Sequence, residues 1–575
     1  MVKRLTSLSP ADGRSSPTPL PDAASHPPID LLNLTFYRQS VRRFIFSNNI
    51  PLTSLVPGET IDLELMHPIV GSPANPCTYA IKDGLLEISS NTTGSPAESA
   101  IYVGGVNPYA VYEIDVQKID LGSSVETDPP QQRQNVEITL DFATADRQTH
   151  IQVAAIYPRA DAAFEVRLVK DGVIAHTSPL FLGPAPEAPY KLQVQLAGIS
   201  LNAFYTKGGQ TTHLGRIDPA TDSFRDHLDL RHRRTALGST FNVLTTLPPG
   251  GGEGGARVVL GGASSYLSAG VGQADVRNIT RRDGAPYFDD AGADRNRLWF
   301  TFTARGLGTG DGTQGVLSLD PSAADFRFEG TVVFDHGDGL LRNDYASHLF
   351  YDDRARAWRA WVCDFGGARR RDGRAGSGLV VAESPRDPRR GFSVMAARAL
   401  AAGSDIAGFH EDPCGFYDEA ARRWRLLTTD MSVGFRAHLF ESVAHGDKGW
   451  DGPYVPVPGS RPVEHNSTGT LIQKIGAERY ALAGSSDGAI FVYSYPSLEE
   501  FGTLKMDLPP FTPGKNSRGK SLCLLCCYVI SYTLFSFGGY GNFGPSDSET
   551  DQERGDLVGE GLGWGRKALS LFQGL

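Results

Sequence analysis

Hydrophobic and polar residues alternate one by one along the first half of the chain, which is the period of a strand with one buried face. Residues 136–142 read Val-Glu-Ile-Thr-Leu-Asp-Phe, and the alternation returns over 164–168 and 192–196. The pair Asp171-Gly172 follows the second of these runs and is typical of a two-residue hairpin turn. Strands and turns at ~10–15-residue spacing predict a β-sandwich of two antiparallel sheets over residues 29–225.

One stretch of this region carries a resemblance. Residues 190–205 (YKLQVQLAGISLNAFY) resemble the closing strands of concanavalin A-like and laminin G-like jelly rolls. The resemblance implies a jelly-roll sandwich that serves either as a packing or spacer module or as a carbohydrate-binding module.

The second half of the chain repeats itself. An aromatic and acidic turn occurs three times, and each copy precedes an aromatic strand. The turns are 283–290 (DGAPYFDD), 349–353 (LFYDD) and 412–419 (DPCGFYDE), and the strands are 298–302, 358–362 and 424–427. A fourth copy over 469–484 keeps the strands without the acids. A unit of ~60 residues fits one four-stranded blade of a β-propeller.

We therefore expect an all-β chain in which the sandwich precedes a five-bladed propeller over residues 238–513. Residues 241–267 are expected to supply part of the first blade, and the propeller is expected to be incomplete at its C-terminal end. The acidic turns are interpreted as hairpin chemistry at a solvated rim rather than as catalytic groups. They comprise Asp289, Asp290, Asp352, Asp353 and Asp418.

Candidate chemistry lies just before each repeat strand. The four positions read Arg281-Arg282-Asp283, Arg342-Asn343-Asp344, His410-Glu411-Asp412 and Glu464-His465-Asn466. Innermost strands of a propeller begin at one mouth of its channel, so these groups are expected to converge there. The alternative is a set of charged loop ends joined by salt bridges. The predicted catalytic residues are Asp283, Asp344, Glu411 and Asp412, and the predicted substrate-binding residues are Arg282, Arg342, His410, Glu464 and His465.

Facing carboxylates suit glycosidic cleavage. One carboxylic acid protonates the leaving oxygen, and a carboxylate acts as base or nucleophile. A third carboxylate tunes the pKa of the acid through like-charge proximity. Arg and His side chains suit the recognition of hydroxyl or carboxylate groups.

At these residues a second resemblance is found. Residues 409–419, continuing to Trp424, are similar to the Asp-Pro blade motif of glycoside hydrolase families 43 and 32. Family 32 implies that Asp412 holds sugar hydroxyls, although Glu411 stands where that family has Arg. Family 43 implies Asp283 as base, Asp344 as pKa modulator and Glu411 as acid. The Asn-Asp-Pro-Asn-Gly nucleophile motif of family 32 is absent, so membership of neither family is claimed.

Two other functions remain open. A polysaccharide lyase would use His410 or His465 as base, with Arg282 and Arg342 neutralising a uronate. Its unsaturated product would absorb near the ultraviolet edge. A lectin or scaffold would only bind a glycan in the funnel.

Composition narrows the range of partners. The 575-residue chain contains 65 Gly and 37 Pro, a turn content that favours many short strands. Its net charge of -10, without a basic stripe, argues against nucleic acid as a partner. No cofactor or metal is predicted: Cys523 and Cys526 lack a second ligand pair, and His336 and Asp338 are interpreted as loop residues. A monomer that acts on a polysaccharide or oligosaccharide is expected.

The chain ends give conflicting signals about compartment. Residues 1–28 lack the apolar stretch of a signal peptide and are expected to be disordered. Four N-glycosylation sequons, at Asn33, Asn91, Asn278 and Asn466, favour an extracellular glycoprotein. Residues 521–537 carry no charge but are at the short limit for a membrane span, so a membrane is not expected as a partner. The whole tail, 514–575, is expected to be disordered or to be translated non-coding sequence.

Overall fold

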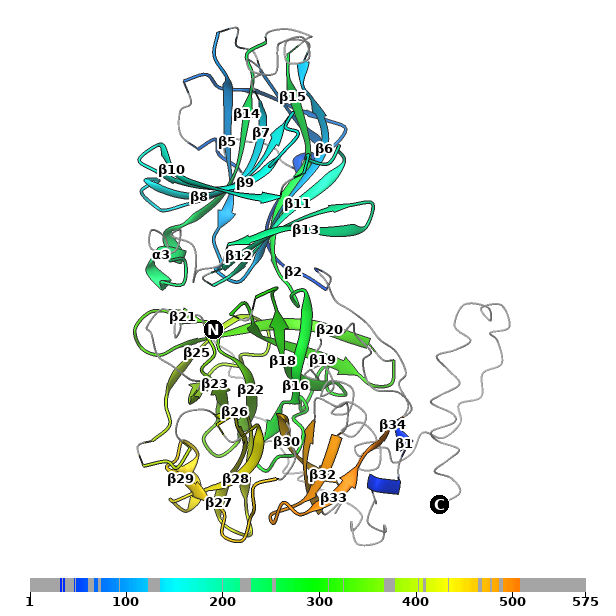
Figure 1. The fold of residues 1–575 in the computed structure, drawn as a ribbon, viewed down its shortest axis with the longest axis vertical. Helices are drawn as coiled ribbons and strands as arrows, with labels where there is room; N and C mark the ends of the chain where they lie inside the picture. Colours follow the sequence, from blue (N-terminus) through cyan, green and yellow to red (C-terminus); the bar gives the residue numbers. More distant parts are fainter. Residues whose placement is uncertain are drawn as a thin grey trace, which may run out of the picture.

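The computed structural model describes most residues between 31 and 506 (Figure 1). The main gaps are 37–45, 60–66, 123–134, 218–228, 251–254, 367–377, 407–409, 464–467 and 485–489, with shorter ones elsewhere. Residues 1–30 and 507–575 lie outside the described part, and so do the predictions made for 1–28, Glu464, His465 and the 514–575 tail. No helix among the described residues has the length and apolar character needed to cross a membrane.

Residues 50–267 form a β-sandwich of two antiparallel sheets. The first sheet has the order β10 (Val173–Phe181), β9 (Phe164–Lys170), β8 (Thr149–Tyr157), β7 (Val136–Ala143), β14 (Thr240–Leu247), β5 (Ala97–Gly105). The second has the order β13 (Gln210–Ile217), β12 (Ser200–Lys207), β11 (Tyr190–Ala197), β6 (Val111–Asp120), β15 (Arg257–Leu267), β4 (Leu85–Ser89), β3 (Thr78–Lys82), and β2 (Ile50–Leu55) also pairs with β15.

The sandwich core follows the period-two pattern of the sequence. Ile138, Leu140 and Phe142 of β7 are fully buried in it. Tyr112 of β6 and Phe241 of β14 pack edge-on, with ring centroids 4.9 Å apart. The predicted sandwich is therefore confirmed.

Its predicted boundary is wrong, because residues 241–267 belong to the sandwich rather than to a first blade. Strand β14 pairs with both β5 and β7, and β15 pairs with β6 and β4. Both are central strands, since each has a neighbour on either side. Local alternation marks them as strands but does not identify their partners, which lie far away in sequence.

Sixteen of the remaining strands fall into four antiparallel groups of four, which we call blades 1 to 4, in a propeller-like array beside the sandwich (Figure 1). Blade 1 contains β16 (Gly272–Asn278), β18 (Leu298–Arg305), β19 (Thr313–Asp320) and β20 (Asp325–Asp335), and blade 2 contains β22 (Tyr345–Asp352), β23 (Ala357–Cys363), β24 (Leu379–Ser384) and β25 (Gly391–Ala399). Blade 3 contains β26 (His410–Asp418), β27 (Arg423–Asp430), β28 (Arg436–Ser442) and β29 (Tyr454–Pro456), and blade 4 contains β30 (Thr468–Ile475), β31 (Glu478–Gly484), β32 (Ile490–Ser494) and β33 (Glu500–Thr503). The count of five blades stays a prediction.

Short strands connect the larger sheets. The outer strands β20 and β25 pair in parallel, which joins blades 1 and 2 into one sheet. Strand β21 (Leu341–Arg342) pairs with β20, and β17 (Thr280–Arg281) pairs with β22. Strand β1 (Thr35–Phe36) pairs in parallel with β34 (Lys505–Met506), so segments from the two ends of the described chain meet.

Two of the acidic turn residues, Asp352 and Asp418, act as hairpin caps, as predicted. Asp352 accepts hydrogen bonds from the backbone N–H groups of residues 354 and 355, and Asp418 does the same for residues 420 and 421. The predicted solvated position is wrong for Asp352, whose side chain is fully buried against Arg359. Burial is possible here because the guanidinium and the turn amides satisfy the carboxylate.

Candidate active site at one mouth of the propeller

The innermost strands β16, β22, β26 and β30 each contain a bulge near their first residues. The ladder register shifts there, and one residue per strand takes a positive φ. These residues are Asp275 (φ 52), Ala346 (φ 54), Asp412 (φ 56) and Gly469 (φ 66). A bulge turns side chains away from the strand plane and toward neighbouring blades. The bulges therefore mark equivalent positions near the first residues of the four inner strands, and we call this end of the blades the mouth.

Asp412 is held at this mouth by three neighbours. The Gly469 N–H and the Thr468 hydroxyl both donate to its Oδ2, at 2.8 and 2.7 Å. Its Oδ1 lies 3.3 Å from the Arg277 guanidinium, which also donates to the carbonyls of Ala346 and Pro413. The side chains of Arg277 and Asp412 are 3% and 5% exposed. Arg277 thus links the inner strands of blades 1, 2 and 3 and stabilises Asp412 as an anion.

Glu411 lies beside Asp412 and uses the same hydroxyl group. Thr468 Oγ1 is 2.6 Å from Glu411 Oε1 and 2.7 Å from Asp412 Oδ2. A threonine hydroxyl has one proton, so it can donate to only one of these oxygens at a time. Two buried carboxylates at such proximity favour a state in which one of them is protonated.

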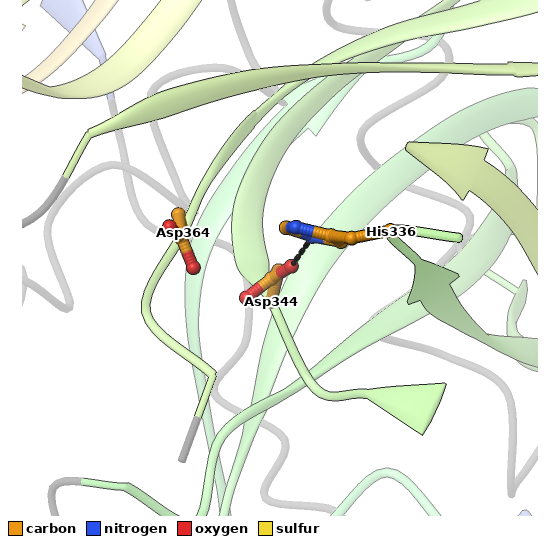
Figure 2. A group of neighbouring side chains, drawn as sticks. All are labelled: His336, Asp344 and Asp364. Atoms are coloured by element: carbon orange, nitrogen blue, oxygen red, sulfur yellow. Dashed lines mark hydrogen bonds and ion pairs between the residues drawn. The ribbon is translucent and has the colours of Figure 1, made fainter. Parts of the chain in front are cut away.

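A second polar group lies at the start of blade 2. Asp344 is fully buried, and its Oδ2 lies 2.9 Å from His336 Nε2. The backbone N–H of Gly366 donates to the other oxygen, Oδ1, at 2.8 Å. Figure 2 shows Asp364 facing this pair from a separate segment, and one ligand atom from each of the three residues lies within 4.8 Å of the others. One imidazole and two carboxylates are a donor set that could hold a divalent cation.

Cys363 connects the two groups. Its Sγ lies 3.1 Å from the backbone nitrogen of Asp412, which donates to it, and Asp364 follows it in sequence. Burial raises the pKa of the Cys363 thiol, and the charges of Asp412 and Glu411 raise it further. Cys77, Cys363 and Cys414 are buried and form no disulfide. Cys363 therefore places the end of β23 beside the start of β26.

Two predicted binding residues lie nearby with their polar groups already engaged. Arg342 forms a bidentate pair with Asp338, and this pair lowers the pKa of Asp338. His410 Nδ1 is 3.0 Å from the Thr428 hydroxyl, and its ring packs edge-on against Phe440 within blade 3. Burial lowers the pKa of His410, so its imidazole is neutral near neutral pH.

Asp283 and Arg282 lie at the opposite end of the propeller. Residues 280–286, which we call the base segment, pass beneath the last residues of the inner strands. The Tyr417 N–H donates to the Arg282 carbonyl, and Arg479 donates to the Asp283 carbonyl. The Arg282 guanidinium lies 3.8 Å from the Tyr417 ring centroid and forms ion pairs with Asp352 and Asp447. The Asp283 carboxylate caps its own turn through the Ala285 N–H.

Arg282 and Asp283 thus lie at the wrong end for the predicted convergence, whereas Asp344, Glu411 and Asp412 lie near the first residues of the inner strands. Their catalytic roles stay a prediction. The true equivalent of Asp412 in blade 1 is Asp275, which accepts a hydrogen bond from Thr303. Sequence reasoning missed it because a long connection between β16 and β18 contains the Asp-Gly motif that imitates the blade 3 turn. Four other residues of the mouth were also missed: Arg277, His336, Asp364 and Thr468. His336 had been interpreted as a loop residue, and its spacing of eight positions before Asp344 was the available signal.

Comparisons with known proteins give partial matches to solved structures. No protein family and no curated protein matches the sequence. The carbohydrate-binding module CBM66 from Bacillus subtilis is 11% identical, with 35% of this chain and 95% of that chain covered and a TM-score of 0.21. The family-43 glycoside hydrolase BlXynB from Bacillus licheniformis is 14% identical, with 37% and 39% covered and a TM-score of 0.24. Peanut lectin is 11% identical, with 34% and 94% covered and a TM-score of 0.22.

Proposed function

We propose that this protein is a carbohydrate-active enzyme, a glycoside hydrolase that cleaves plant or microbial polysaccharide at the mouth formed by blades 2, 3 and 4. The observation that carries the proposal is the pair Glu411 and Asp412, whose carboxylates share the Thr468 hydroxyl. Two neighbouring buried carboxylates favour a state in which one of them is protonated, and a protonated carboxyl is what glycosidic cleavage requires as its general acid.

The contacts favour different roles for the carboxylates. Asp412 has the Arg277 charge and the Gly469 N–H as partners, so it stays ionised and can stabilise positive charge on the sugar ring. Glu411 is then the carboxyl group that holds a proton, and it acts as the acid. Asp344, oriented by Gly366 and His336, is the carboxylate available as base in place of Asp283.

A glycan-binding function without catalysis is the second candidate, because the burial of the Glu411 and Asp412 pair argues against its direct contact with a substrate. Glu411 and Asp412 are only 2% and 4% exposed, and Asp412 is already ion-paired. Such a site can also be a structural polar network. The lyase alternative has less support, because Arg282 lies at the other end and His410 faces the interior of blade 3.

The test is a polysaccharide screen with the purified full-length protein, read both as new reducing ends and as absorbance near the ultraviolet edge. Reducing ends without absorbance are expected from a hydrolase. The Glu411→Gln variant should then lose about 10²- to 10⁴-fold in turnover. Glu441→Gln is the matched control, because Glu441 pairs with Arg425 on the outer part of the same blade.

Three results would contradict the proposal. An ultraviolet-absorbing product would indicate a lyase. Glycan binding without any product would indicate a lectin-like protein. Near-wild-type turnover by Glu411→Gln would remove Glu411 from the reaction.

A further inference from the structure

The sandwich holds the short segment that carries Asp344 at two points, once directly and once through the loop of blade 1 that contains Asp311. We call residues 341–344, which run from β21 to the start of β22, the mouth segment. Leu341 and Asn343 of this segment contact structure that is fixed by the sandwich, whereas Arg342 and Asp344 bring their side chains to the mouth. The two points of attachment are independent of each other.

The first attachment is made through the backbone of Leu341. The hydroxyl of Tyr109, in the connection between β5 and β6, donates to the Leu341 carbonyl at 2.5 Å. The Leu341 N–H donates to the carbonyl of Arg231, in the connection between strands β13 and β14 of the sandwich. Tyr109 is 6% exposed, and its ring stacks on Phe392 of blade 2. A buried donor and acceptor thus join the sandwich to the segment.

The second attachment is made through Asn343. Its side-chain amide, which is fully buried, donates to the carbonyls of Gly310 and Gly312 at 2.9 and 2.7 Å. Asp311, the residue between these glycines, points into the sandwich.

The sandwich holds Asp311 with three of its own side chains. The guanidinium of Arg216 on β13 forms two hydrogen bonds of 2.9 Å with the carboxylate. Ser200 and Asn202 of β12 also donate to it. Asp311 is 1% exposed, and these hydrogen bonds outweigh burial and lower its pKa. A bidentate pair in a buried setting fixes both position and orientation.

From these contacts we infer that the sandwich is a component of the mouth and not a detachable spacer or binding module. Tyr109 and Asp311 are positioning residues: they act on Asp344 through Leu341 and Asn343 and touch no reacting atom. The inference about turnover rests on the proposed hydrolase function, whereas the inference about the position of the mouth segment does not.

Hydrogen–deuterium exchange of the full chain tests the position directly. The variants are Tyr109→Phe, which removes one hydroxyl, and Asp311→Asn, which removes the charge that Arg216 binds. Each should speed exchange in peptides covering 336–344 by about 3- to 10-fold, the effect of one lost hydrogen bond. Exchange in blade 3 should not change.

Two control variants remove similar contacts inside the sandwich. Tyr157→Phe deletes a hydroxyl bonded to the carbonyl of Pro186, and Glu137→Gln breaks a bidentate pair with Arg167. Neither should alter exchange over 336–344. Arg216→Lys is a milder alternative if Asp311→Asn fails to fold, since it keeps the charge and loses the second hydrogen bond.

Unchanged exchange over 336–344 in both Tyr109→Phe and Asp311→Asn, or equal effects from the controls, would overturn the inference. Once a substrate is identified, the positioning variants should lower kcat with little change in KM. Faster exchange in a protein without turnover would count against the proposed function alone.

Discussion

Replacing His348 with Asn should remove part of the acid sensitivity of this protein. His348, on β22, is 2% exposed and lies between the base segment and blade 3. The Gly415 N–H donates to its Nδ1 at 3.0 Å, so Nδ1 has no proton, and Nε2 is the nitrogen that donates to the Thr280 hydroxyl, 3.1 Å away. A second proton on the ring would sit on Nδ1, where this N–H donor would face the N–H donor of Gly415. Burial, together with the charge of Arg277, lowers the pKa of His348 to about 3.

The size of the effect follows from this shift. The unfolded chain binds a proton near the ordinary value of 6.5, and the folded chain does not bind it until about pH 3. Because the folded-state pKa is lowered, the contribution of the neutral His348 to the free energy of unfolding is complete above pH 6.5 and is lost as the pH falls toward 3. Between pH 7 and pH 5 the wild type should lose about 2 kcal/mol of unfolding free energy through this one residue.

Urea unfolding followed by tryptophan fluorescence measures the loss. The ring of Trp361, one of the six tryptophans, stacks on His348 with centroids 5.9 Å apart and reports on the same region. His348→Asn keeps an acceptor for Gly415 and leaves a small cavity, so it should be less stable than the wild type at pH 7. The difference in unfolding free energy between the wild type and His348→Asn should narrow by about 2 kcal/mol at pH 5. An unchanged gap would refute the assignment of a neutral, buried His348.

Three further predictions concern other parts of the molecule. Gly330→Ala should lower the free energy of unfolding by about 1–3 kcal/mol, because the new Cβ would lie 2.6 Å from the Gly391 carbonyl oxygen where blades 1 and 2 pair. Gly272→Ala is the control: its Cβ meets nothing closer than 3.9 Å, so it should leave the thermal unfolding nearly unchanged. Arg282→Lys should lower the free energy of unfolding by about 2 kcal/mol, because the stacking of the guanidinium on Tyr417 and Trp424 is lost. It should leave KM unchanged, and a raised KM would show that Arg282 takes part in substrate binding. Burial opposes a charge on His150, but its hydrogen bond to Asp141 outweighs burial and raises the pKa. The free energy of unfolding in urea should therefore be higher for the wild type than for His150→Gln, most clearly below pH 6.5, and this difference should disappear as the pH rises through the raised pKa. A difference that stays constant with pH would contradict that expectation.

The fold class was predictable because it depends on local periodicity. Alternation over 136–142 and the turn at Asp171-Gly172 mark strands and a hairpin without any information about partners. The partners themselves were not predictable. Residues 240–247 have the pattern of a half-buried strand whether they begin a propeller or complete a sandwich, and only pairing with β5 and β7 decides between these.

The candidate site was predictable where a blade is compact. In blade 3 the acidic residues, the hairpin and the aromatic strand follow within a few positions, so Glu411 and Asp412 were found. In blade 1 the connection after β16 is long, and similar residue types at Asp283 imitate the motif at the wrong end of the strand. The attachment of Asp311 to Arg216 joins residues 95 positions apart and has no local signature.

The place of β14 in the first sheet has a consequence for synthesis. Strand β5 ends at Gly105, but the strand that separates it from β7 is complete only at Leu247, roughly 140 residues later. At ribosomal rates of about 5–20 residues per second this interval is on the order of ten seconds. During that time β5 and β7 each present an unpaired edge, which is a template for aggregation or for a wrong pairing between them. The nascent sandwich is therefore a natural client for chaperones, and a fragment ended at residue 225 would never leave that state.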